Sequence, residues 1–210
     1  MASGPADWTL LGFSDASVPR NRRCGHASAS LSEALNPLTR GQTILAGPMR
    51  VTYLSLTTVA SMEIVGMLLQ LRMAINLLEA TGHAGPVREL PAPRLRLQCY
   101  CDSDLAARVA LEETPESLRD RGAPHLVPMH EELSRHRDRL RSLADIEIEF
   151  RVPARGRRSR GIRAHDEVAR GLRIVEDEPL PADIAAALNL ATAELHAASR
   201  CERQVMTEQY

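Results

Sequence analysis

Three segments of the chain alternate apolar and polar residues with a period of two, and each predicts a β-strand. Residues 50–57 combine this alternation with β-branched and aromatic side chains. Residues 94–101 place every second apolar side chain on one face, and residues 146–152 do the same with charged residues between them. A fourth, short strand is predicted over residues 171–175. The chain therefore has three or four predictable strands.

A long helix is predicted over residues 59–80, which are apolar on nearly every side. Thr58 supplies an N-cap and Gly82 a C-terminal stop. Four polar residues interrupt the helix without forming a stripe: Glu63, Gln70, Arg72 and Asn76. We expect a buried central helix with apolar surface left over for a second subunit, in particular at Met67 and Leu71. Because the interrupting residues are polar or charged, the helix is not expected to span a membrane.

Shorter helices are predicted after residue 103 and from residue 128 to 143, and a C-terminal helix over residues 181–206. Residues 1–42 are rich in Ala, Ser, Gly and Pro, a composition that predicts a flexible N-terminal arm. Trp8 and Phe13 are its aromatic residues, and we expect them to anchor the arm on the body or on a partner chain.

Together these patterns predict an α+β fold. A small three- to four-stranded sheet would pack on the long buried helix at 59–80, with a C-terminal helix and a mobile N-terminal arm. The predicted domain organisation is an arm over residues 1–42 followed by a single α+β domain over residues 43–210.

The amino-acid composition excludes several classes of enzyme mechanism. All 26 basic residues are Arg, because the chain contains no Lys, and this excludes mechanisms built on a P-loop lysine or a Schiff base. The formal net charge of −1 argues against a surface that is basic throughout. No dinucleotide-binding glycine motif, nucleophile elbow or Ca²⁺ loop is present, so no cofactor is predicted.

Positive charge is concentrated in a predicted loop over residues 151–163, which contains six Arg and no acidic residue. Guanidinium groups bind phosphate oxygens in a bidentate manner, so this loop predicts contact with an RNA or DNA backbone or with anionic lipid. Pairing with the acidic residues 176–178, within the chain or across a subunit boundary, remains an alternative. The six residues are Arg151, Arg155, Arg157, Arg158, Arg160 and Arg163.

Two carboxylates, Asp102 and Asp104, follow the predicted strand at 94–101. Acidic residues at the carboxyl end of a strand are typical of Mg²⁺-dependent phosphoryl chemistry, although a helix cap explains the same residues. The pair resembles the first motif of the haloacid-dehalogenase-like phosphatases, in which an apolar strand precedes Asp-x-Asp. That resemblance implies a phosphatase, but Leu105 and Ala106 depart from the family pattern and the family's downstream lysine is missing.

The cysteines and histidines of the chain do not form a recognisable metal-binding motif. Cys99 and Cys101 are two residues apart on a predicted strand, a spacing that favours two buried apolar residues over a zinc knuckle. His125, His130 and His136 are separated by five and six residues, which does not place them on one helical face, so we expect ordinary surface histidines.

The arm, the helix that is apolar on several sides and the Arg loop together predict assembly. The leading hypothesis is a non-enzymatic, self-associating structural or adaptor protein, such as a viral matrix or capsid-associated protein, that contacts an anionic partner. One alternative is a small enzyme with a dispersed active site, in which Asp102 and Asp104 support Mg²⁺-dependent phosphoryl chemistry. Another is a pure protein-interaction module. Four irregularly spaced Cys and the lack of a signal sequence predict a cytoplasmic, reducing location.

Overall fold

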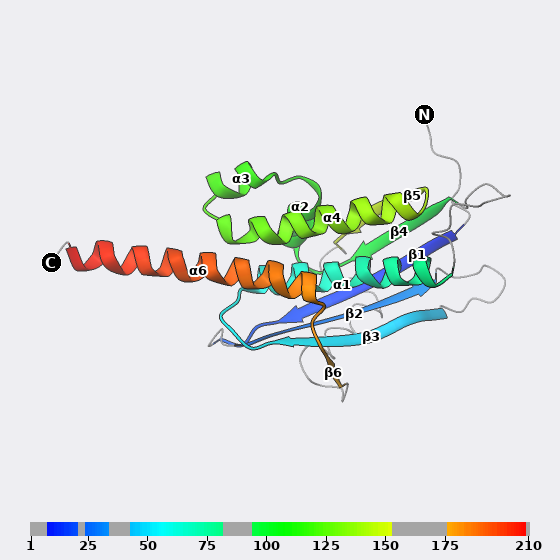
Figure 1. The fold of residues 1–210 in the computed structure, drawn as a ribbon, viewed down its shortest axis with the longest axis horizontal. Coiled ribbons are helices and arrows are strands. Elements are labelled where there is room, and N and C mark those ends of the chain that lie inside the picture. Colours follow the sequence, from blue (N-terminus) through cyan, green and yellow to red (C-terminus); the bar gives the residue numbers. More distant parts are fainter. Residues whose placement is uncertain (1–7, 21–23, 34–42, 82–93, 153–175, 209–210) are drawn as a thin grey trace.

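The computed structural model describes residues 8–20, 24–33, 43–81, 94–152 and 176–208. Strands and helices follow one another in a mixed order, with three strands, a long helix, and then alternating helices and strands (Figure 1). The strands are β1 (Trp8–Ser17), β2 (Gly25–Glu33), β3 (Thr43–Tyr53), β4 (Leu95–Tyr100), β5 (Ile146–Arg151) and β6 (Asp177–Glu178). The helices are α1 (Val59–Ala80), α2 (Asp104–Leu111), α3 (Pro115–Asp120), the 3-10 turn η1 (Pro124–Leu126), α4 (Val127–Leu143) and α6 (Ala182–Glu208).

All six strands belong to one mixed sheet with the order β5-β4-β1-β2-β3-β6. β1, β2 and β3 form an antiparallel meander. β4 returns beside β1 in parallel, β5 lies parallel to β4, and β6 pairs in parallel with β3. β1 is therefore a central strand, hydrogen-bonded to an antiparallel neighbour on one side and a parallel neighbour on the other.

Small side chains explain why β2 did not stand out in the sequence. β2 reads Gly-His-Ala-Ser-Ala-Ser-Leu-Ser-Glu, and its Ala27, Ala29 and Leu31 are fully buried. The serines between them, Ser28, Ser30 and Ser32, are buried as well. A run of Ala and Ser looks like coil by composition, yet it allows a close approach of other elements to both faces of the strand.

The prediction of a mobile arm over residues 1–42 is therefore wrong for the described part of that segment, which forms two of the central strands. The predicted sheet of three to four strands is wrong for the same reason, because the sheet has six. The strands at 94–101 and 146–152 are confirmed, as are the helices at 59–80 and 128–143. The strand predicted at 50–57 overlaps the end of β3, which begins at Thr43 and ends at Tyr53. The predicted strand at 171–175 lies outside the described residues.

α1 forms the centre of the hydrophobic core. It lies against β1 and β2, while α4 packs on α1 and α6 packs on both α4 and α1 (Figure 1). Fifteen of its residues are buried. By length and hydropathy α1 could span a membrane, but 83% of its most apolar window is buried inside the fold, as expected of a core helix.

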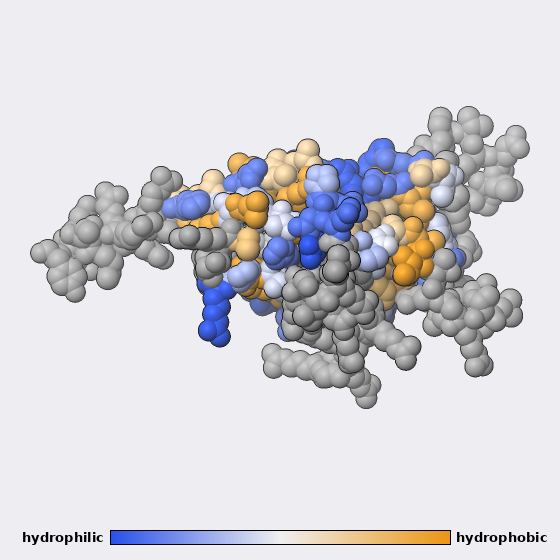
Figure 2. All heavy atoms as spheres, turned by 90° about the horizontal axis from the view of Figure 1, so that it is seen from below, coloured by the Kyte–Doolittle hydropathy of each residue, from blue (hydrophilic) through white to orange (hydrophobic). Residues whose placement is uncertain are grey.

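The exposed large hydrophobic residues lie on several different elements, among them Ile44 on β3, Leu54 after it and Leu190 on α6. On the face seen in Figure 2 the described atoms mix hydrophilic and hydrophobic residues, and neither kind covers the face alone. Singly exposed apolar residues are normal for a monomer, so this distribution gives the predicted homo-oligomer no support.

Candidate functional site

Two carboxylates lie side by side at the ends of β1 and β4. In the parallel pairing of these strands Phe13 is opposite Tyr100. Asp15 lies two residues after Phe13, still within β1. Asp102 lies two residues after Tyr100, just beyond the end of β4. Because parallel strands advance together, the register brings the two aspartates to the same end of the sheet.

A third carboxylate, Glu63, comes from the second turn of α1. Thr58 caps this helix by accepting a hydrogen bond from the backbone N–H of Ser61, at 3.1 Å. Gly66, one turn after Glu63, allows the helix to lie directly on β1, since a Cβ at this position would be only 2.9 Å from Cβ of Ser14. The close contact sets Glu63 above the strand end at the level of Asp15.

The three carboxylates converge. One oxygen from each of Asp15, Glu63 and Asp102 lies within 4.8 Å of the other two. Asp15 is 2% exposed and Glu63 3% exposed, whereas Asp102 is only partly buried. The cluster thus has two buried members and one that reaches the surface.

Burial and charge repulsion together raise the pKa of Glu63 well above its ordinary value. Burial is the largest cause, followed by the charges of Asp102 and Asp15 and a side-chain hydrogen bond with Asp102, while a hydrogen bond from the backbone of Ala16 acts in the opposite direction. With an effective dielectric constant of about 20, two charges 4.8 Å apart repel by about 3.5 kcal/mol. Full ionisation of the cluster is therefore costly unless a cation compensates it.

A buried glutamine braces the strands that carry the aspartates. The side-chain amide of Gln70 donates one hydrogen bond to Oγ of Ser14 and another, 3.1 Å long, to the carbonyl oxygen of Tyr100. Ser14 directly precedes Asp15, and Tyr100 lies two residues before Asp102. Gln70 is fully buried, so these bonds fix the spacing of β1 and β4 at the cluster.

The residues present fit a divalent cation. Carboxylate oxygens are the ligands that Mg²⁺ and Mn²⁺ prefer. Oε2 of Glu63 is buried and has no hydrogen-bond partner within the described part of the chain. Because a buried polar atom without a partner is costly, a cation held between the three carboxylates would satisfy it.

The neighbouring thiols do not contribute a ligand. Cys99 and Cys101 are buried, as the strand pattern predicts. Burial raises the pKa of Cys101 to about 12 and that of Cys99 further still, so both thiols stay protonated at neutral pH. A protonated, buried thiol is a poor metal ligand.

Of the predicted phosphoryl-transfer pair, only Asp102 belongs to the cluster. Asp104 is the first residue of α2, whose cap is Ser103, and it is exposed. Its position is that of an acidic residue favoured at a helix N-terminus. The resemblance to the first motif of the haloacid-dehalogenase-like phosphatases therefore does not extend to the second aspartate.

The predicted Arg loop lies almost entirely outside the described residues. Arg151 is the last residue of β5, and its guanidinium pairs with the carboxylate of Glu149. The acidic segment that was considered as a partner for the loop places Asp177 against Arg50 and Thr52 of β3 instead. The remaining arginines, Arg155, Arg157, Arg158, Arg160 and Arg163, are not described.

The residues predicted to make arm and subunit contacts pack within the chain. Trp8 and Phe13 belong to β1, and Phe13 stacks on the ring of Tyr100 with centroids 5.4 Å apart. Met67 and Leu71 are completely buried in the core formed by α1. Phe13, Met67 and Leu71 are thus buried within this chain, and Trp8 is partly buried against its core.

Sequence reasoning missed Asp15 and Glu63. Asp15 lay in the segment interpreted as an arm, and Glu63 was treated only as an interruption of an apolar helix. Two signals were available: an acidic residue at the end of the apolar run that begins at Trp8, and a lone acid in the first half of a buried helix. An acid within an apolar strand or an apolar helix is a candidate functional residue.

No family model and no curated protein matches the chain. Several solved structures are similar to the chain. The prototype foamy virus protease-reverse transcriptase has a TM-score of 0.50 at 15% identity, over 84% of this chain and 22% of that one. The N-terminal RNase H domain of a Mycobacterium tuberculosis protein has a TM-score of 0.48 at 15% identity, over 79% of this chain and 99% of that one. LC9-RNase H1, a type 1 RNase H with the type 2 active-site motif, has a TM-score of 0.43 at 18% identity, over 81% of this chain and 72% of that one.

Identities this low bear on the fold alone: this chain, a mixed six-stranded sheet with helices, is similar in fold to these RNase H domains. The leading prediction from the sequence, a non-enzymatic structural or adaptor protein, is contradicted because the structural neighbours are RNase H domains. The enzyme alternative fits better. A nucleic-acid partner is compatible with these neighbours.

Proposed function

We propose that this protein is a hydrolase that cleaves phosphodiester bonds of a nucleic acid with the help of a divalent cation. The observation that carries the proposal is the convergence of Asp15, Glu63 and Asp102, from three different elements, within 4.8 Å of one another. No structural role explains it, because grouping three acids in a mostly buried place weakens the fold unless they bind something positive.

Each side chain has a distinct position in the proposed site. Oδ1 of Asp15 accepts the backbone N–H of Ala16 at 2.8 Å, which orients the carboxylate. The raised pKa of Glu63 favours its protonated form in the absence of a cation. Asp102, the member that reaches the surface, lies where a phosphate group can approach. A divalent cation bound by such oxygens polarises a phosphoryl oxygen and lowers the pKa of a bound water.

The substrate class rests on the fold as well as on the site. The solved RNase H domains share this mixed sheet, and nucleic acid is the substrate their names imply. The arginines at 151–163 suit a polyanionic partner, as expected from the sequence. A cation site built from oxygen ligands alone suits phosphate esters, whose own oxygens complete the coordination.

A cleavage assay tests the proposal. End-labelled RNA, DNA and RNA–DNA hybrid of one sequence are incubated with the protein in Mg²⁺, in Mn²⁺ and in EDTA. We expect cleavage of at least one substrate that requires the cation. Glu63→Gln should lower the rate by about 100-fold or more, because it removes a charge from the site.

Glu79→Gln is the matched control, since Glu79 lies near the other end of the same helix and pairs with Arg139 at the surface. It should cleave like the wild type. Cleavage that survives EDTA, or that Glu63→Gln and Glu79→Gln affect equally, would contradict the proposal.

A further inference from the structure

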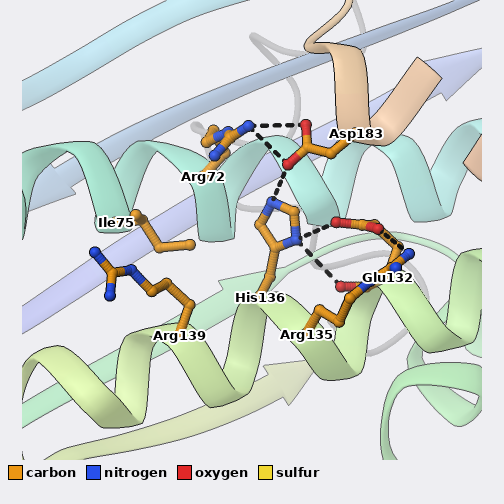
Figure 3. A pocket seen from close by; sticks show the side chains of 7 residues that line it. All are labelled: Arg72, Ile75, Glu132, Arg135, His136, Arg139 and Asp183. Carbon is orange, nitrogen blue, oxygen red and sulfur yellow. Dashed lines mark hydrogen bonds and ion pairs between the residues drawn. The ribbon is translucent and has the colours of Figure 1, made fainter. Parts of the chain in front are cut away.

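A second cluster of ionisable side chains lies on the opposite side of α1, where α4 and the start of α6 meet it. Glu132 and His136 come from α4, and Asp183 from the first turn of α6. They line an open pocket of about 300 Å³ together with Arg72, Ile75, Arg135 and Arg139 (Figure 3). Arg72 is nine residues beyond Glu63 on α1, about 13 Å along the helix, so this pocket is separate from the carboxylate cluster.

His136 is the central residue of the pocket, and its burial was not foreseen. The sequence predicted a surface histidine, but the side chain is 4% exposed. Its Nδ1 lies 2.9 Å from Oε1 of Glu132 and 3.1 Å from the carbonyl oxygen of the same residue. Both atoms are acceptors, so Nδ1 carries the proton. Figure 3 shows the ring held between Glu132 on one side and Asp183 on the other.

The other ring nitrogen is left in an unfavourable position. Nε2 of His136 is buried and makes no hydrogen bond within the described residues. It faces Oδ2 of Asp183 at 3.7 Å, too far for a hydrogen bond. With the proton on Nδ1, a neutral imidazole directs its lone pair at a carboxylate oxygen. A buried ring nitrogen without a hydrogen bond, 3.7 Å from an oxygen of a half-buried carboxylate, is a favourable place for a positive species.

We propose that Nε2 of His136 and the carboxylate of Asp183 bind a Zn²⁺ ion at this pocket. Zinc lies about 2.0 to 2.2 Å from nitrogen and oxygen ligands, so a separation of 3.7 Å corresponds to an angle of about 130° at the metal, a moderately opened tetrahedral geometry. Imidazole nitrogen favours Zn²⁺ over Mg²⁺. The pocket supplies room for water molecules at the remaining positions.

The surrounding residues are those that support a metal-binding histidine and carboxylate. Glu132 accepts the Nδ1 proton and so fixes the tautomer that exposes the Nε2 lone pair, the arrangement found around most zinc-bound histidines. Arg72 donates two hydrogen bonds to Asp183, at 2.7 and 2.8 Å. The backbone N–H of Ile184 donates a third hydrogen bond to Oδ1 of Asp183, at 3.0 Å. A carboxylate has about four lone-pair sites, which leaves one, on Oδ2, for a metal.

Each arginine of the pocket pairs with a carboxylate, and Arg72 would share Asp183 with the proposed ion. Arg72 pairs with Asp183, Arg135 with Glu132, and Arg139 with Glu79. The ion would join the middle of α4 to the first turn of α6. Its role would be structural, because it would hold the first turn of α6 against α4.

Zinc titration tests the site without relying on nuclease activity. Asp15→Asn with Asp102→Asn serves as the background, because these changes remove the oxygen-only cluster. By calorimetry we expect one Zn²⁺ per chain, with affinity unchanged by millimolar Mg²⁺. The imidazole ¹⁵N resonance of Nε2 in His136 should shift on binding.

His136→Asn in this background should lower the affinity at least about tenfold, whereas His130→Asn on the same helix should leave it unchanged. Circular dichroism in EDTA confirms that each variant is folded. Absence of Zn²⁺ binding would overturn the proposal, and so would binding that persists in His136→Asn or an unshifted Nε2 resonance. Because the background has no intact carboxylate cluster, these results are independent of the proposed nuclease function.

Discussion

Replacement of Glu63 by Gln is expected to stabilise the metal-free protein while it abolishes activity. Glu63 is buried beside Asp15 and Asp102, and its pKa in the folded protein is raised well above the ordinary value. A carboxyl group with a raised folded pKa contributes stability fully at low pH. That contribution is lost as the pH rises from the unfolded pKa through the folded one, because the unfolded chain then ionises while the folded site holds its proton.

The size of the effect follows from this linkage. Each pH unit between the two titrations costs about 1.4 kcal/mol of unfolding free energy. In a protein of this size 1 kcal/mol corresponds to about 2 to 4 °C in Tm. Wild-type protein in EDTA should therefore lose about 3 to 6 °C per pH unit over that interval. Glutamine has nearly the same shape and does not ionise, so the variant should not show this part of the pH dependence.

Thermal unfolding between pH 4 and pH 8, in EDTA and in Mg²⁺, measures both effects. Glu63→Gln should melt above wild type at pH 7.5 in EDTA and gain little from Mg²⁺, whereas wild type gains several degrees. Glu113→Gln is the control, because Glu113 is also buried but pairs with Arg121 at 3.1 Å, and its loss should lower Tm. A Glu63→Gln variant that melts at or below wild type throughout would refute the reasoning.

Three further predictions concern the same region. The affinity for Mg²⁺, measured by thermal shift at several pH values, should fall as the pH is lowered through the titration of Glu63, because the cation must displace its proton; a pH-independent affinity would contradict this. Gln70→Leu should destabilise the protein by about 1 to 3 kcal/mol in urea unfolding, because it removes the hydrogen bonds from the buried Gln70 amide to Ser14 and to the carbonyl of Tyr100, and an unchanged midpoint would contradict this role of Gln70. Gly66→Ala should cost about 1 to 3 kcal/mol despite the higher helix propensity of Ala, since the new methyl meets Ser14, and a more stable variant would show that α1 does not need this close contact.

Strong periodicity made part of this fold predictable. The apolar run of α1 and the alternation in β4 and β5 gave elements close to those observed, since each carries large apolar side chains at a regular period. β2 was not predicted because its buried positions are occupied largely by Gly, Ala and Ser, and β1 because its buried positions, Leu10 and residues 12–15, do not alternate regularly. Those small residues are what the close packing of α1 requires, so the composition that suggested a flexible arm is a consequence of burial at the centre of the sheet.

The candidate site was predictable only in part for a different reason. Asp102 follows a clear strand, and its position alone suggested phosphoryl chemistry. Asp15 and Glu63 lie 48 residues apart in the sequence, and neither belongs to a local motif. The pairing of β1 with β4 brings Asp15 to Asp102, and the contact of Gly66 with Ser14 brings Glu63 to Asp15; both are long-range contacts. His136 was misjudged in the same way, because its burial depends on α6.

The rates of nucleic-acid cleavage by Asp102→Asn and Asp104→Asn, measured side by side in Mg²⁺, test the central claim most directly. Both changes convert an aspartate to its amide within three residues of each other, but only Asp102 belongs to the carboxylate cluster. The account predicts that Asp102→Asn loses activity by about 100-fold or more while Asp104→Asn cleaves at close to the wild-type rate. Equal activity in the two variants, or a greater loss in Asp104→Asn, would contradict it.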